Sequence, residues 1–172
     1  MKIIGQITFV VFLTFLLFGP KIFEHNPKAE QSVQGIKTSQ CQTNGALPDS
    51  NCTPGAIDQN VRQENIYQTI CSKGYTKTVR PPVEYTEKLK IEQIKEYGYS
   101  DTSLRDYEED HLIPLELGGN PSDPKNLWPE PIGSARQKDE IENLCNEKVC
   151  DGKISLIEAQ KGIAGNWQTA CQ

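Results

Sequence analysis

Two adjacent residues, Asp110 and His111, have side chains whose types suit hydrolytic chemistry. The chain has only two histidines, and a neutral imidazole, with an unperturbed pKa of about 6.5, can accept a proton from water near neutral pH. A divalent metal ion held by a carboxylate can stabilise a phosphate group and its leaving oxygen. An aspartate and a histidine side by side therefore supply residue types that hydrolysis of a phosphodiester bond needs.

The elements next to this pair must bring both side chains to one site. Adjacent residues of a strand point to opposite faces, so a shared site needs an irregular strand end or a reach around an edge. The partly alternating apolar residues of Leu112–Leu117 predict a strand that a proline interrupts, and Gly118–Pro121 predicts a turn. Asn126–Pro129 then predicts a short returning strand, which completes a hairpin.

Two helices are predicted after the hairpin. Ser134 and Gln137 form a capping box at the start of the first helix, whose apolar residues have helical spacing and which ends at Gly152. Ser155 and Glu158 form a second capping box at the start of the last helix. The buried stripe expected of this last helix consists of Leu156, Ala159, Ile163 and Trp167.

Short elements are predicted before the hairpin. Ile66–Ile70 indicates a short helix or turn, and Thr76–Val79 has the composition of a strand. A highly charged helix is predicted from a cap at Thr86 to Gly98, since glycine is typical of helix C-caps. The chain as a whole therefore reads as an α+β protein.

The amino terminus predicts export. The apolar run Ile7–Phe18 follows a lysine and indicates a signal peptide over residues 1–23. A good small-residue cleavage site is missing and the run approaches the roughly 20 residues of a spanning helix, so membrane contact through an uncleaved anchor stays open. Residues 24–50 lack apolar periodicity and predict a linker, and residues 51–172 predict the domain. The expected location is secreted or periplasmic, or anchored to the membrane.

Six cysteines, an even number, suit an oxidising compartment in which disulfides persist. Because no Cys-x-x-Cys occurs and both histidines lie far from any cysteine pair, disulfides are favoured over a structural zinc site. Sequence leaves fifteen pairings open, of which Cys52–Cys71 and one pair among the three carboxy-terminal cysteines are the simplest. The candidates are Cys41, Cys52, Cys71, Cys145, Cys150 and Cys171.

Composition narrows the function classes. The net charge of −5 over 172 residues excludes a generic basic nucleic-acid coat protein, because neutralising phosphates needs an excess of lysine and arginine. A single apolar run excludes a protein with several membrane spans. A local basic patch stays open, with Lys73, Lys77 and Arg80 among its candidates.

The string EEDHLIPLELGGN, followed by NLWPEP and ARQKDEIEN, resembles a group of exported bacterial proteins of the H-N-H endonuclease superfamily. The motif core covers residues 107–145, and the flanks from Gly45 to Trp167 resemble that group alone. The resemblance implies an α+β fold with a ββα-metal core of hairpin plus helix. Additional helices and stapling disulfides would surround this core.

The resemblance also implies roles for individual residues. His111 is expected to be the general base and Asp110 a metal ligand, while Asn126 is expected to hold the His111 ring by a hydrogen bond and to brace the hairpin arms. The family's second ligand is a histidine or asparagine on the following helix, but no histidine follows His111 in this chain. Asp139 is the expected replacement, with Ser134 and Asn143 as less suitable alternatives.

The expected cofactor is a divalent metal ion. A site built from carboxylate oxygens favours Mg²⁺ or Mn²⁺ over Zn²⁺. The candidates for contact with a phosphate near this site are Lys125, Arg136 and Lys138.

The sequence thus predicts an exported, metal-dependent endonuclease that hydrolyses phosphodiester bonds of DNA or RNA. The alternative is a non-catalytic secreted binding or cell-surface module that keeps the hairpin as a scaffold. The missing histidine favours the alternative, whereas the Asp110-His111 pair together with Asn126 opposes it. The expected partner is nucleic acid as substrate, and nothing indicates a protein partner.

Overall fold

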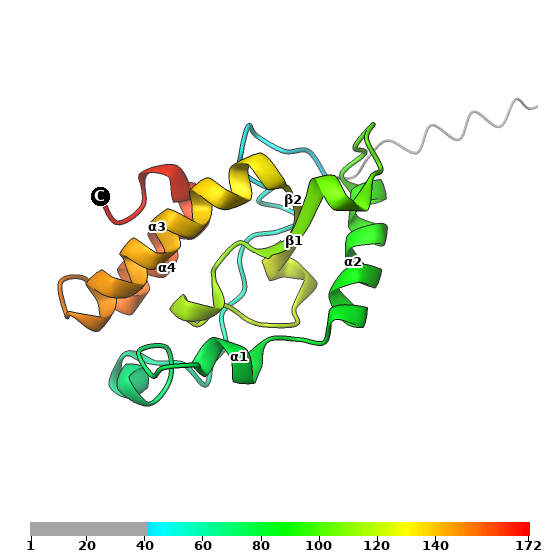
Figure 1. The fold of residues 1–172 in the computed structure, drawn as a ribbon. Helices are drawn as coiled ribbons and strands as arrows, with labels where there is room; N and C mark the ends of the chain where they lie inside the picture. The colour runs from blue at the N-terminus through cyan, green and yellow to red at the C-terminus, as the bar shows by residue number, and fades with distance from the viewer. Residues whose placement is uncertain (1–40) are drawn as a thin grey trace, which may run out of the picture. The chain divides into compact units, whose positions relative to one another are not determined.

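The computed structural model describes residues 41–172, which combine α-helices with a two-stranded antiparallel sheet (Figure 1). The predicted leader and residues 24–40 of the predicted linker lie outside the described residues. The α+β prediction is confirmed. The helices are α1 (Tyr75–Val79), α2 (Val83–Glu96), α3 (Ile132–Cys150) and α4 (Leu156–Asn166), and the strands are β1 (Tyr107–His111) and β2 (Leu127–Pro131). Short 3₁₀ helices occupy Gln63–Gln68, Leu104–Asp106, Leu115–Leu117, Pro124–Asn126 and Trp167–Thr169.

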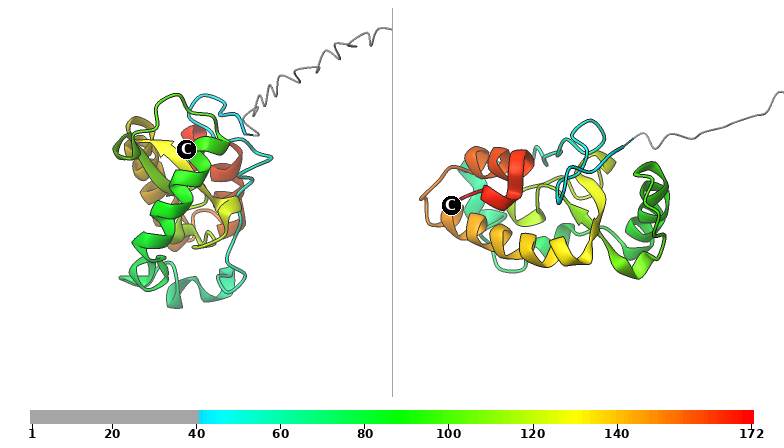
Figure 2. Two further views of the ribbon diagram at one scale, coloured as in Figure 1. Left: turned by 90° about the vertical axis from the view of Figure 1, so that its right-hand side faces the viewer. Right: turned by 90° about the horizontal axis from the view of Figure 1, so that it is seen from above.

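The two strands form a ribbon between two helices. β1 and β2 pair with Tyr107 opposite Pro131 and with His111 opposite Leu127. Both α2 and α3 contact the two strands, and the ribbon lies between these helices (Figures 1 and 2). α3 starts directly after β2, and α4 packs beside α3. The order in the chain is therefore strand, returning strand and helix, with no linker between β2 and α3.

The first strand lies earlier than the sequence predicts. Residues 112–117, expected to form a strand, instead form the connection that leaves β1 and a 3₁₀ helix at Leu115–Leu117. Every apolar residue of this stretch is at most 4% exposed. Their apolar character therefore reflects packing within the core on all sides and not the period-two alternation of a half-buried strand.

The strand predicted over Thr76–Val79 is also wrong, because these residues belong to α1. The described residues offer this short segment no neighbouring strand, so its backbone groups bond locally. The Lys77 amide donates to the carbonyl of Gly74, and the Arg80 amide donates to the carbonyl of Thr76. Local bonding therefore outweighs the strand preference of threonine and valine.

Two predicted helix starts are displaced and one is correct. α2 begins at Val83 instead of near Thr86, and α3 begins at Ile132, so the Ser134 hydroxyl donates to a carbonyl and caps nothing. Proline precedes both helices, where its fixed φ suits a helix start. α4 has the predicted capping box, since Ser155 and Glu158 each accept the other's backbone amide proton.

The part of the chain from α3 onward contributes seven of the twelve buried core residues. The predicted stripe of the last helix is buried, each member being at most 4% exposed, although Trp167 lies in the 3₁₀ helix that follows α4. It packs with the buried positions of α3 and with apolar residues of the connection between β1 and β2. The core therefore fixes the connection, and through it the end of β1, against α3 and α4. Its buried residues are Val61, Ile66, Ile70, Ile113, Leu117, Cys145, Val149, Leu156, Ala159, Ile163, Trp167 and Ala170.

Three disulfides link the described residues, which is typical of extracellular proteins. The predicted pair Cys52–Cys71 is wrong, whereas one pair does join two of the three carboxy-terminal cysteines. Within residues 41–172, no helix is both long enough and apolar enough to cross a membrane. The bonds are Cys41–Cys52, Cys71–Cys150 and Cys145–Cys171.

The last ten residues of the predicted linker, 41–50, pack on the domain. Cys41 is 3% exposed, and its amide donates to the carbonyl of Glu96 at the end of α2. Cys41 also packs with Tyr97 and Trp128 in a small apolar cluster. A disulfide and an apolar cluster therefore hold residues 41–50 on the domain, although this segment has no periodicity of its own.

Gly119 lies where the connection between the strands folds back on itself. A Cβ atom at Gly119 would lie 1.7 Å from the carbonyl oxygen of Ile113 and 2.8 Å from the side-chain nitrogen of Asn126. We expect Gly119→Ala to lower the free energy of unfolding by about 3 kcal/mol, because buried backbone would have to move. Gly133→Ala is the control, since its Cβ would meet no atom within 4 Å and alanine favours a helix by about 1 kcal/mol. Urea unfolding followed by tryptophan fluorescence measures both, and equal effects would contradict the close approach.

Candidate functional site

His111 stands at the end of β1, where it lines an open cavity of about 300 Å³. Residues of β1, of α2 and of the segment between α1 and α2 form the walls of this cavity. His111 is only 5% exposed, so most of its surface is covered by protein and only a small part faces the cavity. We call this space the His111 cavity.

A single hydrogen bond sets the state of the His111 ring. Its Nε2 atom lies 3.0 Å from the carbonyl oxygen of Pro121. A carbonyl oxygen only accepts, so Nε2 carries the proton and Nδ1 is left with a free lone pair. Burial lowers the pKa of His111 below its ordinary value, although the Pro121 carbonyl and Asp110 oppose this shift. The ring is therefore a neutral base at pH 7, held in one tautomer.

Two cationic side chains border the same cavity. Lys90, on α2, is 7% exposed and donates to Glu87 Oε1 at 2.8 Å and to the carbonyl of Tyr107 at 3.3 Å. Arg80 is exposed, and among residues 41–172 it has no ion-pair partner. The guanidinium of Arg80 is therefore available to an anion beside His111, whereas the Lys90 charge is partly neutralised by its own helix.

Glu109 is a further ionisable residue of β1 that lines the cavity. Residues two apart on a strand share a face, so Glu109 and His111 lie on the same face of β1. Both carboxyl oxygens of Glu109 are buried without a hydrogen-bond partner among the described residues. Burial raises the pKa of Glu109 to about 9, against the opposing charge of Lys90. One strand face thus carries a neutral base and, two residues away, a carboxyl group that keeps its proton at pH 7.

Asp110 contacts α3 instead of this cavity. The ammonium of Lys138 donates to Asp110 Oδ2 at 2.7 Å, to the carbonyl of His111 at 2.8 Å and to Glu142 Oε1. Lys138 is 1% exposed, and an ammonium group has three protons to donate. All three are used, so Lys138 joins α3 to the end of β1 with its hydrogen-bonding capacity filled.

The carboxylates around Lys138 influence one another strongly. Burial alone would raise the pKa of Asp110, but the Lys138 ammonium holds it below its ordinary value. Burial, with the negative charge of Asp110, raises the pKa of Glu130 to about 9, and burial also raises the pKa of Glu142 against the opposing charge of Lys138. We call Asp110, Glu130, Lys138 and Glu142 the buried ion cluster. At pH 7 it holds at least one proton on its glutamates.

These residues do not fit the expected divalent metal ion. Asp139, the expected second ligand, is exposed, because its neighbour Lys138 is the residue that α3 turns toward the ribbon. Asp110, the expected first ligand, already binds the Lys138 ammonium. Within residues 41–172, no three histidine, cysteine, aspartate or glutamate side chains form a group that could hold a metal ion.

The basic residues expected to contact phosphate are not brought together. Lys138 is wrong as a phosphate contact, because it is buried and its three protons are bound. Lys125 and Arg136 are both exposed, but neither lines the His111 cavity. Arg80, one candidate of the broader basic set, is the exposed cation that does line it.

Asn126 braces the connection between the strands and does not hold the His111 ring. The Asn126 side chain accepts a hydrogen bond from the Ile113 amide and donates to the carbonyls of Ile113 and Asn120, each at 3.0 Å. The expected bond from Asn126 to the ring is replaced by the one from His111 to Pro121. Asn126 therefore acts on His111 through the shape of the connection.

Sequence reasoning missed Glu109 and Lys90. The signal for Glu109 was its spacing of two from His111, which becomes visible only when the strand is placed at Tyr107–His111. The signal for Lys90 was weaker, because a lysine in a highly charged helix is normally exposed. Contacts with β1 bury it.

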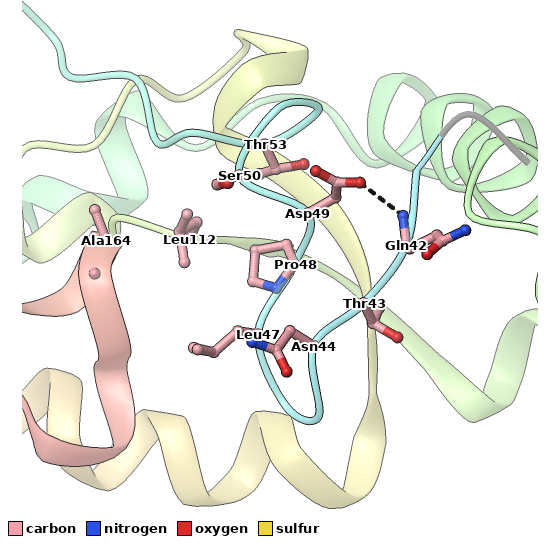
Figure 3. A pocket seen from close by; sticks show the side chains of 11 residues that line it. Gln42, Thr43, Asn44, Leu47, Pro48, Asp49, Ser50, Thr53, Leu112 and Ala164 are labelled. Atoms are coloured by element: carbon pink, nitrogen blue, oxygen red, sulfur yellow. Dashed lines mark hydrogen bonds between the residues drawn. The ribbon is translucent and has the colours of Figure 1, made fainter.

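A second cavity, of about 520 Å³, lies between the segment 42–53 and the end of α4 (Figure 3). Asp49 is the only one of its lining residues that titrates, and its carboxylate accepts from the Gln42 amide at 2.8 Å. The remaining lining side chains are neutral. This cavity thus lacks an acid–base pair, and the chemistry of the described residues is concentrated at the His111 cavity.

The buried ion cluster predicts a large effect of one substitution. We expect Lys138→Met to lower the free energy of unfolding by about 3–5 kcal/mol, because it leaves the largely buried Asp110 carboxylate without its cation. Lys161→Met, at an exposed position of α4, is the control and should change stability by less than about 0.5 kcal/mol. Urea unfolding of both variants measures the difference. A loss for Lys138→Met no larger than that of the control would contradict the arrangement.

Comparison with known proteins gives no further guide to the site. No family model, curated protein or solved structure matches this chain. The functional conclusion therefore rests on the geometry of the His111 cavity and the buried ion cluster.

Proposed function

We propose that this protein cleaves phosphodiester bonds of DNA or RNA, with His111 as the general base. The observation that carries the proposal is the state of the His111 ring at an open cavity, with Nε2 bound to the Pro121 carbonyl and Nδ1 free. A base that is neutral, fixed in one tautomer and next to open space is ready to accept a proton from an attacking hydroxyl group.

The other groups of the His111 cavity suit the same reaction. The nucleophile passes its proton to Nδ1 of His111 as its oxygen bonds to phosphorus. Negative charge then grows on the phosphate oxygens, where Arg80 and Lys90 supply positive charge. The leaving oxygen needs a proton or a positive charge, and Glu109 carries a proton on the same strand face.

Substrate contact in this proposal is local. The whole chain has a net charge of −5, so long-range attraction of nucleic acid is weak. Arg80 is exposed at the His111 cavity, and its planar guanidinium can bind two oxygens of one phosphate. Binding that depends on few such contacts weakens only gently as the salt concentration rises.

The fold supports the resemblance on which the expectation was based. β1, β2 and α3 follow one another in the order of a ββα core, with Asp110-His111 at the end of β1 and Asn126 just before β2. The disulfides support an exported protein. A hairpin, a helix and a histidine at the strand end are the parts that the H-N-H resemblance implies.

One observation favours a second candidate, a secreted binding module without catalysis. Lys138 neutralises Asp110 from within the fold, so the hairpin is stable as a scaffold without any added cation. In that case the His111 cavity binds an anionic group through Arg80 and no bond is broken.

We expect His111→Ala to lower the rate of cleavage by about 10²–10⁴-fold, the usual contribution of a general base. The assay incubates the oxidised protein with supercoiled plasmid and with single-stranded RNA, in Mg²⁺, in Mn²⁺ and in EDTA. His25→Ala replaces the only other histidine and is the control, with the wild-type rate expected. Cleavage that persists in His111→Ala would contradict the role of this base. No cleavage of either substrate by folded wild-type protein would support the binding module.

The pH dependence follows from the state of His111. Only the unprotonated ring can accept a proton, and burial lowers the pKa of His111 below about 6.5. The rate should therefore be independent of this group at pH 7 and fall as the pH drops through the lowered pKa. A rate profile between pH 4.5 and 8 measures the inflection. A rate that falls toward high pH across pH 6.5–7.5 would contradict a base at this position.

A further inference from the structure

We propose that the ammonium of Lys138 is the resident cation of the buried ion cluster, so that the protein holds no divalent metal ion beside Asp110. The inference rests on the proposed function only for its consequence, which is cleavage that does not depend on added metal. The ammonium of Lys138 occupies the space between β1 and α3. Its occupancy can be tested without any substrate.

The oxygen atoms around Lys138 form a cation site. Two carboxylates and one backbone carbonyl converge on a single nitrogen, and the distances to Asp110 and to the His111 carbonyl are 2.7 Å and 2.8 Å. Glu142 completes the set from the same helix, four residues after Lys138. Hard cations such as Mg²⁺, Mn²⁺ and Ca²⁺ take oxygen ligands of these kinds. The chain has filled the position with its own charge.

The rotation of α3 about its axis explains why a lysine, and not a metal ligand, lies beside Asp110. Residues four apart share a helix face, so Lys138 and Glu142 lie together on α3, and Lys138 reaches the ribbon. Asp139 is turned about 100° from Lys138 and is exposed. For Asp139 to take the ligand position, α3 would have to rotate and expose a lysine that is now 1% exposed. The core residues Cys145 and Val149, on the same helix, oppose that rotation.

The ammonium of Lys138 is hard to displace because it belongs to the chain itself. An incoming ion competes with an ammonium that is already covalently attached and bound by three acceptors. The displaced lysine would need a path to water, although its whole side chain is buried. By holding the His111 carbonyl as well as Asp110, Lys138 also positions the end of β1 from which the His111 ring extends.

Titration with Mn²⁺ tests the proposal, with binding measured by calorimetry and by electron paramagnetic resonance. The five proteins are the wild type, Asp110→Asn, Lys138→Ala, Lys161→Ala and the double variant that combines Lys138→Ala with Asp110→Asn. We expect no saturable binding to the wild type or to Lys161→Ala, whose lysine is exposed on α4. We expect Lys138→Ala to bind one Mn²⁺ ion, because its carboxylates and the His111 carbonyl then surround an empty position. Combining Lys138→Ala with Asp110→Asn should remove that binding.

Thermal unfolding keeps the test valid when Lys138→Ala is poorly stable. A ligand that binds only the folded state multiplies the ratio of folded to unfolded protein by about 100 at 100 times its dissociation constant. The midpoint of Lys138→Ala should therefore rise with Mn²⁺, while that of the wild type should not. Even a variant that folds only in the presence of Mn²⁺ reports the new site.

Two results would overturn the proposal. The first is saturable binding of Mn²⁺ to the wild type that Asp110→Asn removes. The second is a Lys138→Ala protein that neither binds nor is stabilised by Mn²⁺, because the carboxylates would then form no cation site. The proposed cleavage is assessed separately, by the wild-type rate in EDTA. An inactive wild type without bound Mn²⁺ would contradict the proposed function and leave the resident lysine supported.

Discussion

The bond between a buried lysine and the end of β1 determines the geometry of the candidate site. Lys138 is the only described side chain that joins α3 to both Asp110 and the His111 carbonyl. Among the described residues, the remaining side-chain hydrogen bond of His111 is the one from its ring to the Pro121 carbonyl. The arrangement divides the adjacent pair: Asp110 serves structure on one side of the ribbon, and His111 faces the cavity on the other.

The sequence predicts which helices and strands occur in the carboxy-terminal half better than the residues at which they begin and end. The returning strand, the α4 capping box and the buried stripe of α4 follow from local signals that the structure keeps. The apolar run after His111 was misleading, because complete burial of a connection removes the alternation that marks a strand. The disulfide partners depend on three-dimensional proximity, as Cys71 and Cys150 are 79 residues apart. The pattern of neighbouring residues gives no information on which cysteines so far apart in the sequence meet in the fold.

The candidate site was predictable in its residues and not in their roles. Asp110, His111 and Asn126 are all near the strand ends, as expected, but each has a partner that the sequence could not name. Lys138 looked like an exposed phosphate contact because lysines are rarely buried. Its burial depends on carboxylates from β1 and α3 together, a combination that appears only when the hairpin and helix are packed. The ion pair between β1 and α3 therefore gives Asp110 and Lys138 structural roles that the sequence alone does not indicate.

The disulfide between Cys71 and Cys150 encloses the whole candidate site within one covalent ring. The ring contains α1, α2, both strands and α3, and it therefore includes Arg80, His111 and Lys138. A protease that cuts one peptide bond anywhere inside the ring produces a nicked chain whose two parts stay attached. The packed core and the buried ion cluster then still hold the new ends near their original places. One cut inside this ring therefore does not release a fragment while the Cys71–Cys150 bond is intact.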